Sequence, residues 1–250
     1  MEENKVWISN NILEWDYYSD GGSFISREDR ERAYDIWAHA ADLIDTAQNN
    51  FNLADGITNL KRSLNQRLQL IEKVYQLKTI NIPNKPKGYL ELLELLGLVR
   101  PYIMKQLFEV RNDIEHRDSP PPNKIRCSEL LDVVWYFLKS TDPFVQLKKS
   151  GLNFELLDNE GNDTHYWFSL NWNFEDEKSS SINGWFPEEY IVTTEKKEGF
   201  IEVIYEKYYG KEKWVNAGKH NDKLDTDIYL SGKINQINIP NVVNKVLTSF

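Results

Sequence analysis

The chain has 250 residues, of which 40% are hydrophobic, 28% charged and 13% aromatic, and its formal net charge is −9. This apolar content can form a buried core, which excludes a wholly disordered chain, and no apolar run approaches the roughly 18 residues that span a bilayer. The negative charge argues against a protein that binds nucleic acid only by neutralising phosphates over its whole surface.

The charge is distributed unevenly along the chain. Lys and Arg minus Asp and Glu give −7 for residues 1–50, +5 for residues 51–150 and −7 for residues 151–250. An anionic ligand is therefore most expected at the middle segment. An ordinary solvated helix surface would explain the same basic excess.

The cysteine content and the amino-terminal residues help to predict the cellular compartment. Cys127 is the only cysteine, which rules out an internal disulfide and a multi-cysteine zinc site. Residues 1–5 open with acidic residues and lack the apolar segment of a secretory signal. We therefore expect a cytoplasmic protein that does not associate with membranes.

Helical patterns dominate up to about residue 140. The first 26 residues are mixed, with a turn at Asp20–Ser23, and Ser26 is suited to cap the first helix because acids follow it. Apolar residues at three- and four-residue spacing predict helices over residues 27–48, 56–78, 89–97, 101–118 and 128–140. Gly97 is suited to end the third of these helices, and Pro120–Pro122 stop the fourth.

Beyond Pro143, short aromatic and β-branched runs alternate with turn residues, which predicts strands. These strands are expected over residues 153–158, 165–173, 189–194, 200–208 and 226–231. Asn159–Asn162 should form a hairpin turn, residues 175–184 a polar loop, and a short helix should follow Pro240. The predicted fold class is α+β, with an all-α bundle over residues 1–148 and a β-rich domain of unknown role over residues 149–250.

The fourth expected helix carries the segment Arg111-Asn112-Asp113-Ile114-Glu115-His116. With about 100° per residue, its apolar stripe consists of Ile103, Leu107, Val110 and Ile114. Asn112 and His116 lie about 160° from Ile114, one turn apart. Arg111 flanks the stripe at about 60°. His116 is therefore expected on an exposed polar face, or in a groove or symmetric interface, and not in the core of its own helix.

This segment resembles the RNxxxH form of the Rx4-6H motif of the HEPN superfamily, and the expected helices match the family's bundle of four or five helices. The resemblance covers little more than half of the chain. It implies a metal-independent endoribonuclease of the toxin or defence type that needs no cofactor. Such an enzyme attacks the adjacent phosphate with a ribose 2′-hydroxyl and leaves 2′,3′-cyclic phosphate ends.

The residue types fit these implied catalytic roles. His116 can move a proton near neutral pH, and Arg111 offers a fork of donors to a phosphate. Asn112 can orient His116 or a phosphate oxygen. A tyrosine two residues after the histidine occurs in one branch of the family, but Asp118 stands there in this chain.

The basic residues nearest the motif are candidates for substrate binding. They are Lys61, Arg62, Arg67 and Arg117. The expected partners are RNA, with tRNA as one candidate, a second copy of the chain in a homodimer, and a cognate regulator or antitoxin. No metal ligands are predicted.

Three other sets of residues could have either a functional or a purely structural role. Cys127 could pair with His116 as a nucleophile, but a small core residue is expected. Asp163 and His165 could contribute to a metal site, yet no third ligand recurs at a suitable spacing. The aromatic residues of the carboxy-terminal segment could stack on bases, although core packing is the commoner use of such residues in strands.

A second interpretation belongs to a different class of protein. The chain could be a non-catalytic HEPN-like binding or regulatory module whose β-rich half recognises a partner or ligand. The acidic net charge favours this interpretation, whereas the intact Arg111, Asn112 and His116 favour the enzyme.

Overall fold

The computed structural model describes the chain except for residues 1–3, 81, 83, 174–179, 196–197, 211–226, 236–238 and 250 and the side chains of Ile103 and Ile239. The chain forms two compact units. The helical unit comprises Ser23–Lys78 and Gly88–Lys148, and the sheet unit comprises Met1–Gly22, Thr79–Lys87 and Lys149–Phe250.

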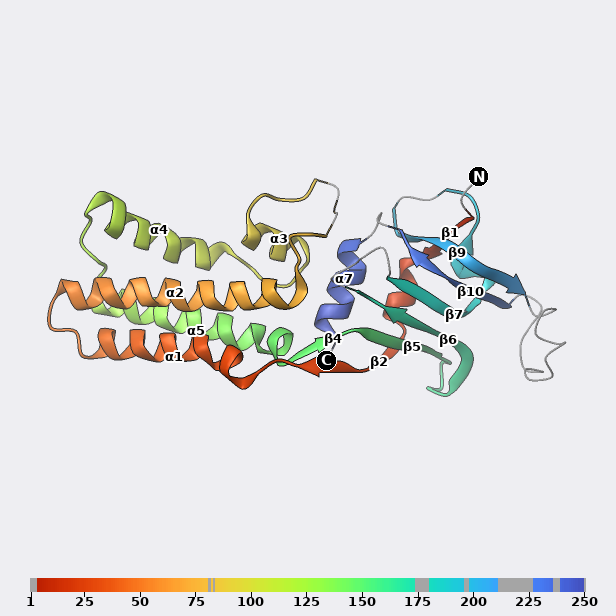
Figure 1. The fold of residues 1–250 in the computed structure, drawn as a ribbon, viewed down its shortest axis with the longest axis horizontal. Helices are drawn as coiled ribbons and strands as arrows, with labels where there is room; N and C mark the ends of the chain where they lie inside the picture. Colours follow the sequence, from red (N-terminus) through yellow and green to blue (C-terminus); the bar gives the residue numbers. More distant parts are fainter. Residues whose placement is uncertain are drawn as a thin grey trace. The chain divides into compact units, whose positions relative to one another are not determined.

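Five helices form the helical unit (Figure 1). They are α1 (Arg27–Asp45), α2 (Asn50–Tyr75), α3 (Tyr89–Leu95), α4 (Tyr102–Arg117) and α5 (Lys124–Gln146). The helices α1, α2 and α5 pack against one another, and α4 runs alongside α2. Their shared core is aliphatic, with residues such as Ile57, Leu64 and Val134 fully buried.

The helix boundaries follow local chemistry in most places. The Ser26 hydroxyl accepts the backbone N–H of Asp29, as expected of an N-cap, and Gly97 has the positive φ of a residue that ends a helix. The start expected at residue 56 is wrong, because the Asn49 side chain caps α2 by accepting from the N–H of Asn52. The helix α5 passes through Pro143 to Gln146.

The sheet unit contains an eight-stranded antiparallel sheet with the order β2-β5-β6-β7-β10-β9-β1-β8. Its strands are β1 (Lys5–Ser9), β2 (Asp16–Ser19), β5 (Gly151–Leu157), β6 (Asp163–Asn171), β7 (Ser181–Pro187), β8 (Ile191–Val192), β9 (Phe200–Gly210) and β10 (Asp227–Ile234). The 3-10 turns η1 (Asn10–Glu14) and η3 (Glu188–Tyr190) and the helix α7 (Ile239–Thr248) complete the unit. Two short strands, β3 (Gly22–Phe24) and β4 (Leu147–Lys149), pair with each other.

Aromatic rings form much of the core of the sheet unit. Phe154 and Phe168 stack with centroids 4.4 Å apart, and Trp15 meets Phe168 edge-on. A side chain at position 184 would collide with the backbone of the neighbouring strand, so Gly184 lets β6 and β7 approach closely. The aromatic residues of this segment are therefore mainly core residues, although Trp167 remains exposed.

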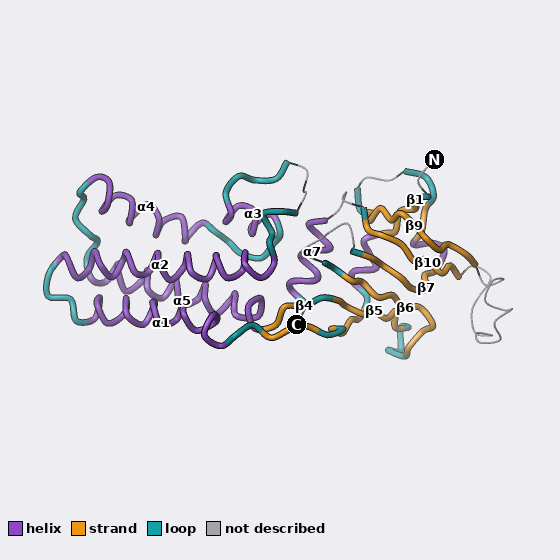
Figure 2. Tube along the Cα trace, in the orientation of Figure 1, coloured by secondary structure: helices purple, strands orange, loops and turns teal. Residues whose placement is uncertain are grey.

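The predicted fold class is wrong in one respect. The helices of residues 27–146 do precede the large sheet, but the amino-terminal segment is not helical, because β1 and β2 belong to that sheet and make the fold mixed α/β (Figure 2). The strand β1 lies between β9 and β8, and Lys5 neutralises the buried carboxylate of Glu202 at 2.9 Å.

The carboxy-terminal strands agree with the sequence pattern in part. The expected hairpin turn is confirmed between β5 and β6, where Gly161 has φ +82° and the N–H of Asp158 donates to the carbonyl of Asn162. The polar loop expected over residues 175–184 is wrong from Ser181 onward, where β7 begins, and residues 175–179 lie outside the described part. None of the described helices combines the length and apolar character that crossing a bilayer requires.

Candidate functional site

The motif helix α4 begins after Pro101 and ends at Asp118, whose left-handed backbone (φ +50°) stops the helix. Asn112 and His116 are exposed, on the side that the helical wheel predicted. Arg111 is mostly buried, with 21% of its side chain exposed. The three motif residues therefore divide between an open face and a partly enclosed edge of the same helix.

The packing of α4 is looser than that of the other long helices. Within the described part of its apolar stripe, Leu107 is buried, whereas Val110 and Ile114 are only half-buried. The side chain of Ile103 lies outside the described residues. Because α4 packs mainly on α2, its flanking residue Arg111 faces the edge where these two helices meet.

Arg111 makes two contacts within its own helix. Its guanidinium pairs with the carboxylate of Glu115 one turn later, and its Nη1 donates to Oδ1 of Asn112 at 3.3 Å. Its Nε–H is buried without an acceptor among the described residues. A buried donor without a partner is costly, so Arg111 keeps a hydrogen-bonding capacity that the described residues do not use.

A cavity of about 340 Å³ lies beside Arg111, between α2 and α4. It is lined by Thr58, Lys61, Arg62, Asn65, Gln66, Gln69 and Arg111. We call this cavity the Arg111 pocket. Two of the predicted substrate-binding residues, Lys61 and Arg62, thus lie in one cavity with the predicted catalytic arginine.

The lining of the Arg111 pocket is cationic, and Glu115, which pairs with Arg111, is not among the lining residues. Three of its lining residues carry positive charge and none is acidic. Lys61 and Arg111 line the same cavity, and burial, and next the charge of Arg111, lower the pKa of Lys61. The Lys61 ammonium has only the ring of Phe108 as a described partner, at 5.8 Å. An anion in this pocket would relieve the repulsion between its cations.

His116 and Arg117 lie outside the Arg111 pocket. His116 is exposed and makes no hydrogen bond or ion pair with any described residue. Arg117 is exposed and pairs with Asp113 at 2.9 Å on the surface of α4. Within one copy of the chain, His116 can therefore reach a substrate only from the open face of α4.

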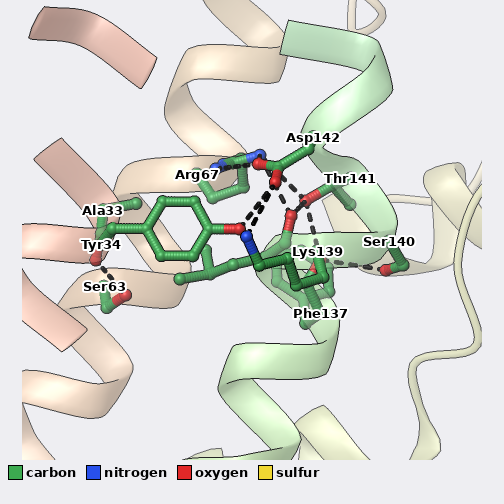
Figure 3. Close-up of polar contacts among 10 residues, drawn as sticks. Ala33, Tyr34, Ser63, Arg67, Phe137, Lys139, Ser140, Thr141 and Asp142 are labelled. Carbon is green, nitrogen blue, oxygen red and sulfur yellow. Dashed lines mark hydrogen bonds and ion pairs between the residues drawn. The ribbon is translucent and has the colours of Figure 1, made fainter. Parts of the chain in front are cut away.

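Arg67 occupies a different environment from the other predicted substrate-binding residues. Its guanidinium is fully buried, and both terminal nitrogens donate to Oδ1 of Asp142 at 2.9 Å (Figure 3). Tyr34 donates to the other oxygen of Asp142 at 2.8 Å, and Lys139 lies 3.7 Å from it. Burial, and next the hydrogen bond to the Asp142 carboxylate, raise the pKa of the Tyr34 hydroxyl. Arg67 thus joins α2 to α5 inside the helical unit.

Four lining residues were not expected as site residues: Thr58, Asn65, Gln66 and Gln69. Their three- and four-residue spacing with Lys61 and Arg62 places them on one face of α2, and that pattern could have identified them. The same spacing could have predicted the burial of Arg67, which lies three residues after Leu64 and four before Ile71 on the buried face.

The remaining candidate residues do not assemble around α4. Cys127 is fully buried, and burial raises the pKa of its thiol, which disfavours a nucleophilic thiolate. His165 contacts the buried carboxylate of Asp227 at 2.6 Å, and Tyr166 donates to the same carboxylate at 2.7 Å. In the described part of the chain, no three His, Cys, Asp or Glu residues cluster in a way that could hold a metal ion.

Comparisons of the chain with protein-family models, with curated proteins and with solved structures found no match.

Proposed function

We propose that the protein is a metal-independent endoribonuclease of the HEPN type, with Arg111, Asn112 and His116 as its catalytic residues. One observation carries the proposal: the motif arginine lines a cationic cavity with Lys61 and Arg62. The exposed His116 lies on the same helix, a little more than one turn further on. Because His116 lies on the open face of α4, outside the Arg111 pocket, an RNA strand bound in the pocket would have to extend around α4 to reach the histidine.

The proposed reaction is an internal transfer at phosphorus. A ribose 2′-hydroxyl loses its proton, its oxygen bonds to the adjacent phosphorus, and the bond from phosphorus to the 5′-oxygen breaks. The leaving oxygen takes a proton, so the products are a 2′,3′-cyclic phosphate and a free 5′-hydroxyl. His116 serves as proton donor or acceptor, Arg111 stabilises the charge on the phosphoryl oxygens, and Asn112 holds the Arg111 guanidinium.

Such a transfer benefits from both a base and an acid, but each chain supplies one motif histidine. A two-fold interface along α4 would bring a second His116 to the site, because an isologous contact places each residue near its own copy. We therefore propose a homodimer. The same proposal includes an RNA substrate, with tRNA as one candidate. It also includes a cognate regulator or antitoxin and a cytoplasmic role in defence.

A specific observation favours a second candidate function. The carboxylate of Glu115 already neutralises Arg111, and the net charge of the chain is −9. Both features suit a non-catalytic HEPN-like module that binds a ligand or partner without cleaving RNA. In that case the helical unit would bind an anion and leave it intact.

One experiment separates the two functions. The purified protein is incubated with total tRNA and with structured RNA in EDTA, and the ends of any products are mapped. Cleavage with cyclic phosphate ends supports the nuclease. Intact RNA of every class, at protein concentrations where RNA binding is measurable, supports the binding module.

A further inference from the structure

One face of α2 carries an uninterrupted row of polar side chains toward the Arg111 pocket. The row consists of Thr58, Lys61, Arg62, Asn65, Gln66 and Gln69. No acidic residue occurs between Asp55 and Glu72. Exposed faces of long helices commonly mix both signs of charge, so a face without carboxylates over more than three turns is suited to an anionic ligand.

The row changes chemistry along the helix. Lys61 and Arg62 are donors only, whereas Asn65, Gln66 and Gln69 each offer both a donor and an acceptor. A phosphate presents only acceptors, and a nucleobase edge presents donors and acceptors together. The cationic end therefore matches a phosphate, and the amide end matches a base.

The dimensions agree with this division. Lys61 and Gln69 are eight residues apart, which is about 12 Å along a helix. The cavity volume of about 340 Å³ is at the small end of the range for small-molecule sites. Arg111 lines the same cavity as Lys61 and Arg62 and adds a third positive charge to its lining.

We propose that the Arg111 pocket binds one unpaired nucleotide of an RNA strand. Lys61, Arg62 and Arg111 hold its phosphate, and the amides of Asn65, Gln66 and Gln69 contact the edge of its base. The choice of RNA over a free nucleotide rests on the proposed nuclease function. A base inside a duplex cannot present its pairing edge to these amides, so the pocket selects loops, bulges or single-stranded ends.

The test measures binding separately from cleavage. Fluorescence titrations with the full-length His116→Ala protein compare a five-nucleotide single strand, a duplex of the same sequence, a nucleoside 5′-monophosphate and inorganic phosphate. Four homopolymeric single strands report the preference among bases. The variants are Lys61→Ala at the cationic end and Gln66→Leu at the amide end. Gln48→Leu is the matched control, since Gln48 is an exposed amide outside the pocket.

We expect the single strand to bind at least tenfold more tightly than the duplex and the monophosphate. Lys61→Ala should weaken all four homopolymers by a similar factor, because phosphate contacts carry no sequence information. Gln66→Leu should instead reduce the preference among bases severalfold, and Gln48→Leu should change neither quantity. Equal binding of duplex and single strand, or an unchanged base preference in Gln66→Leu, would overturn the proposal. A monophosphate that binds as tightly as the strand would overturn the assignment to RNA.

These outcomes are independent of the nuclease assay. If the strand binds as described but the wild-type protein leaves all RNA intact, the nucleotide pocket stands and the nuclease proposal fails. If the wild-type protein cleaves RNA while Gln66→Leu retains its base preference, the nuclease proposal stands and the nucleotide pocket fails.

Discussion

Arg67 of α2 and Asp142 of α5 form an ion pair in which the guanidinium is completely removed from solvent and the carboxylate is 36% exposed. The pair connects two helices that are distant in sequence, and the arginine also donates to the carbonyl of Leu138 at 3.3 Å. A buried guanidinium that loses its carboxylate keeps its desolvation penalty, and Arg67 would retain only the neutral acceptors Leu138 and Thr141.

The first prediction follows from this ion pair. Asp142→Ala should lower the free energy of unfolding by about 3 kcal/mol, as is usual when one partner of a buried pair is removed. Arg67→Met should lower the free energy of unfolding by less, because it removes the buried charge itself and leaves no buried cation without a carboxylate. Urea unfolding measures both values. The control is Asp132→Ala, an exposed acid on the same helix, and an equal loss in this variant would show that the ion pair has no special role.

The second prediction concerns catalysis. His116→Ala and Arg111→Ala should each reduce RNA cleavage by about 100-fold or more, because they remove the proton-transfer group and the phosphate ligand. Since His116 is exposed, its loss should change stability by no more than about 0.5 kcal/mol. His39→Ala is the matched control, because His39 is an exposed histidine on α1. Cleavage by His116→Ala at the wild-type rate would refute the catalytic assignment.

The third prediction concerns metal ions. Proton transfer by His116 and charge stabilisation by Arg111 need no metal, so the cleavage rate should be the same in EDTA and in Mg²⁺. The products should carry 2′,3′-cyclic phosphates, which mass spectrometry distinguishes from 3′-hydroxyl ends. Strict dependence on Mg²⁺ together with 3′-hydroxyl ends would require a different mechanism.

The fourth prediction concerns assembly. If two copies share the site through α4, sedimentation should report a homodimer, and the inactive Arg111→Ala and His116→Ala chains should regain part of their activity when refolded together. Mixing each variant with itself provides the control. A strictly monomeric protein with full activity would refute the shared site. The roles of Arg111 and His116 would then rest on the second prediction alone.

The fifth prediction concerns the pH dependence of anion binding. Burial and Arg111 lower the pKa of Lys61, so its ammonium loses its proton at a lower pH than an ordinary lysine. Phosphate affinity should therefore decline as the pH rises through this lowered pKa, since only the protonated lysine attracts the anion. Lys61→Arg should keep the affinity constant over the same range. If phosphate affinity declines in the same way in Lys61→Arg, a group other than Lys61 must be responsible for the decline.

Local sequence patterns determined the order of the helices in residues 27–146 and several of their ends. The capping hydroxyl of Ser26, the positive φ of Gly97 and the prolines after Asp118 act within a few residues of where they stand. The exposure of Asn112 and His116 follows from the 3.6-residue period of one helix. These features depend on neighbours along the chain, so one segment suffices to predict them.

The tertiary structure alone decided which distant segments meet. Val6-Trp7-Ile8 is a short apolar run without a period, and it becomes a strand only because β9, almost 200 residues later, supplies its hydrogen-bond partners. Likewise, helical spacing could place Arg67 on the buried face of α2, but only the fold supplied Asp142, on another helix, as the partner of its charge. The Arg111 pocket exists because α4 lies along α2, and no local pattern in either helix specifies that contact.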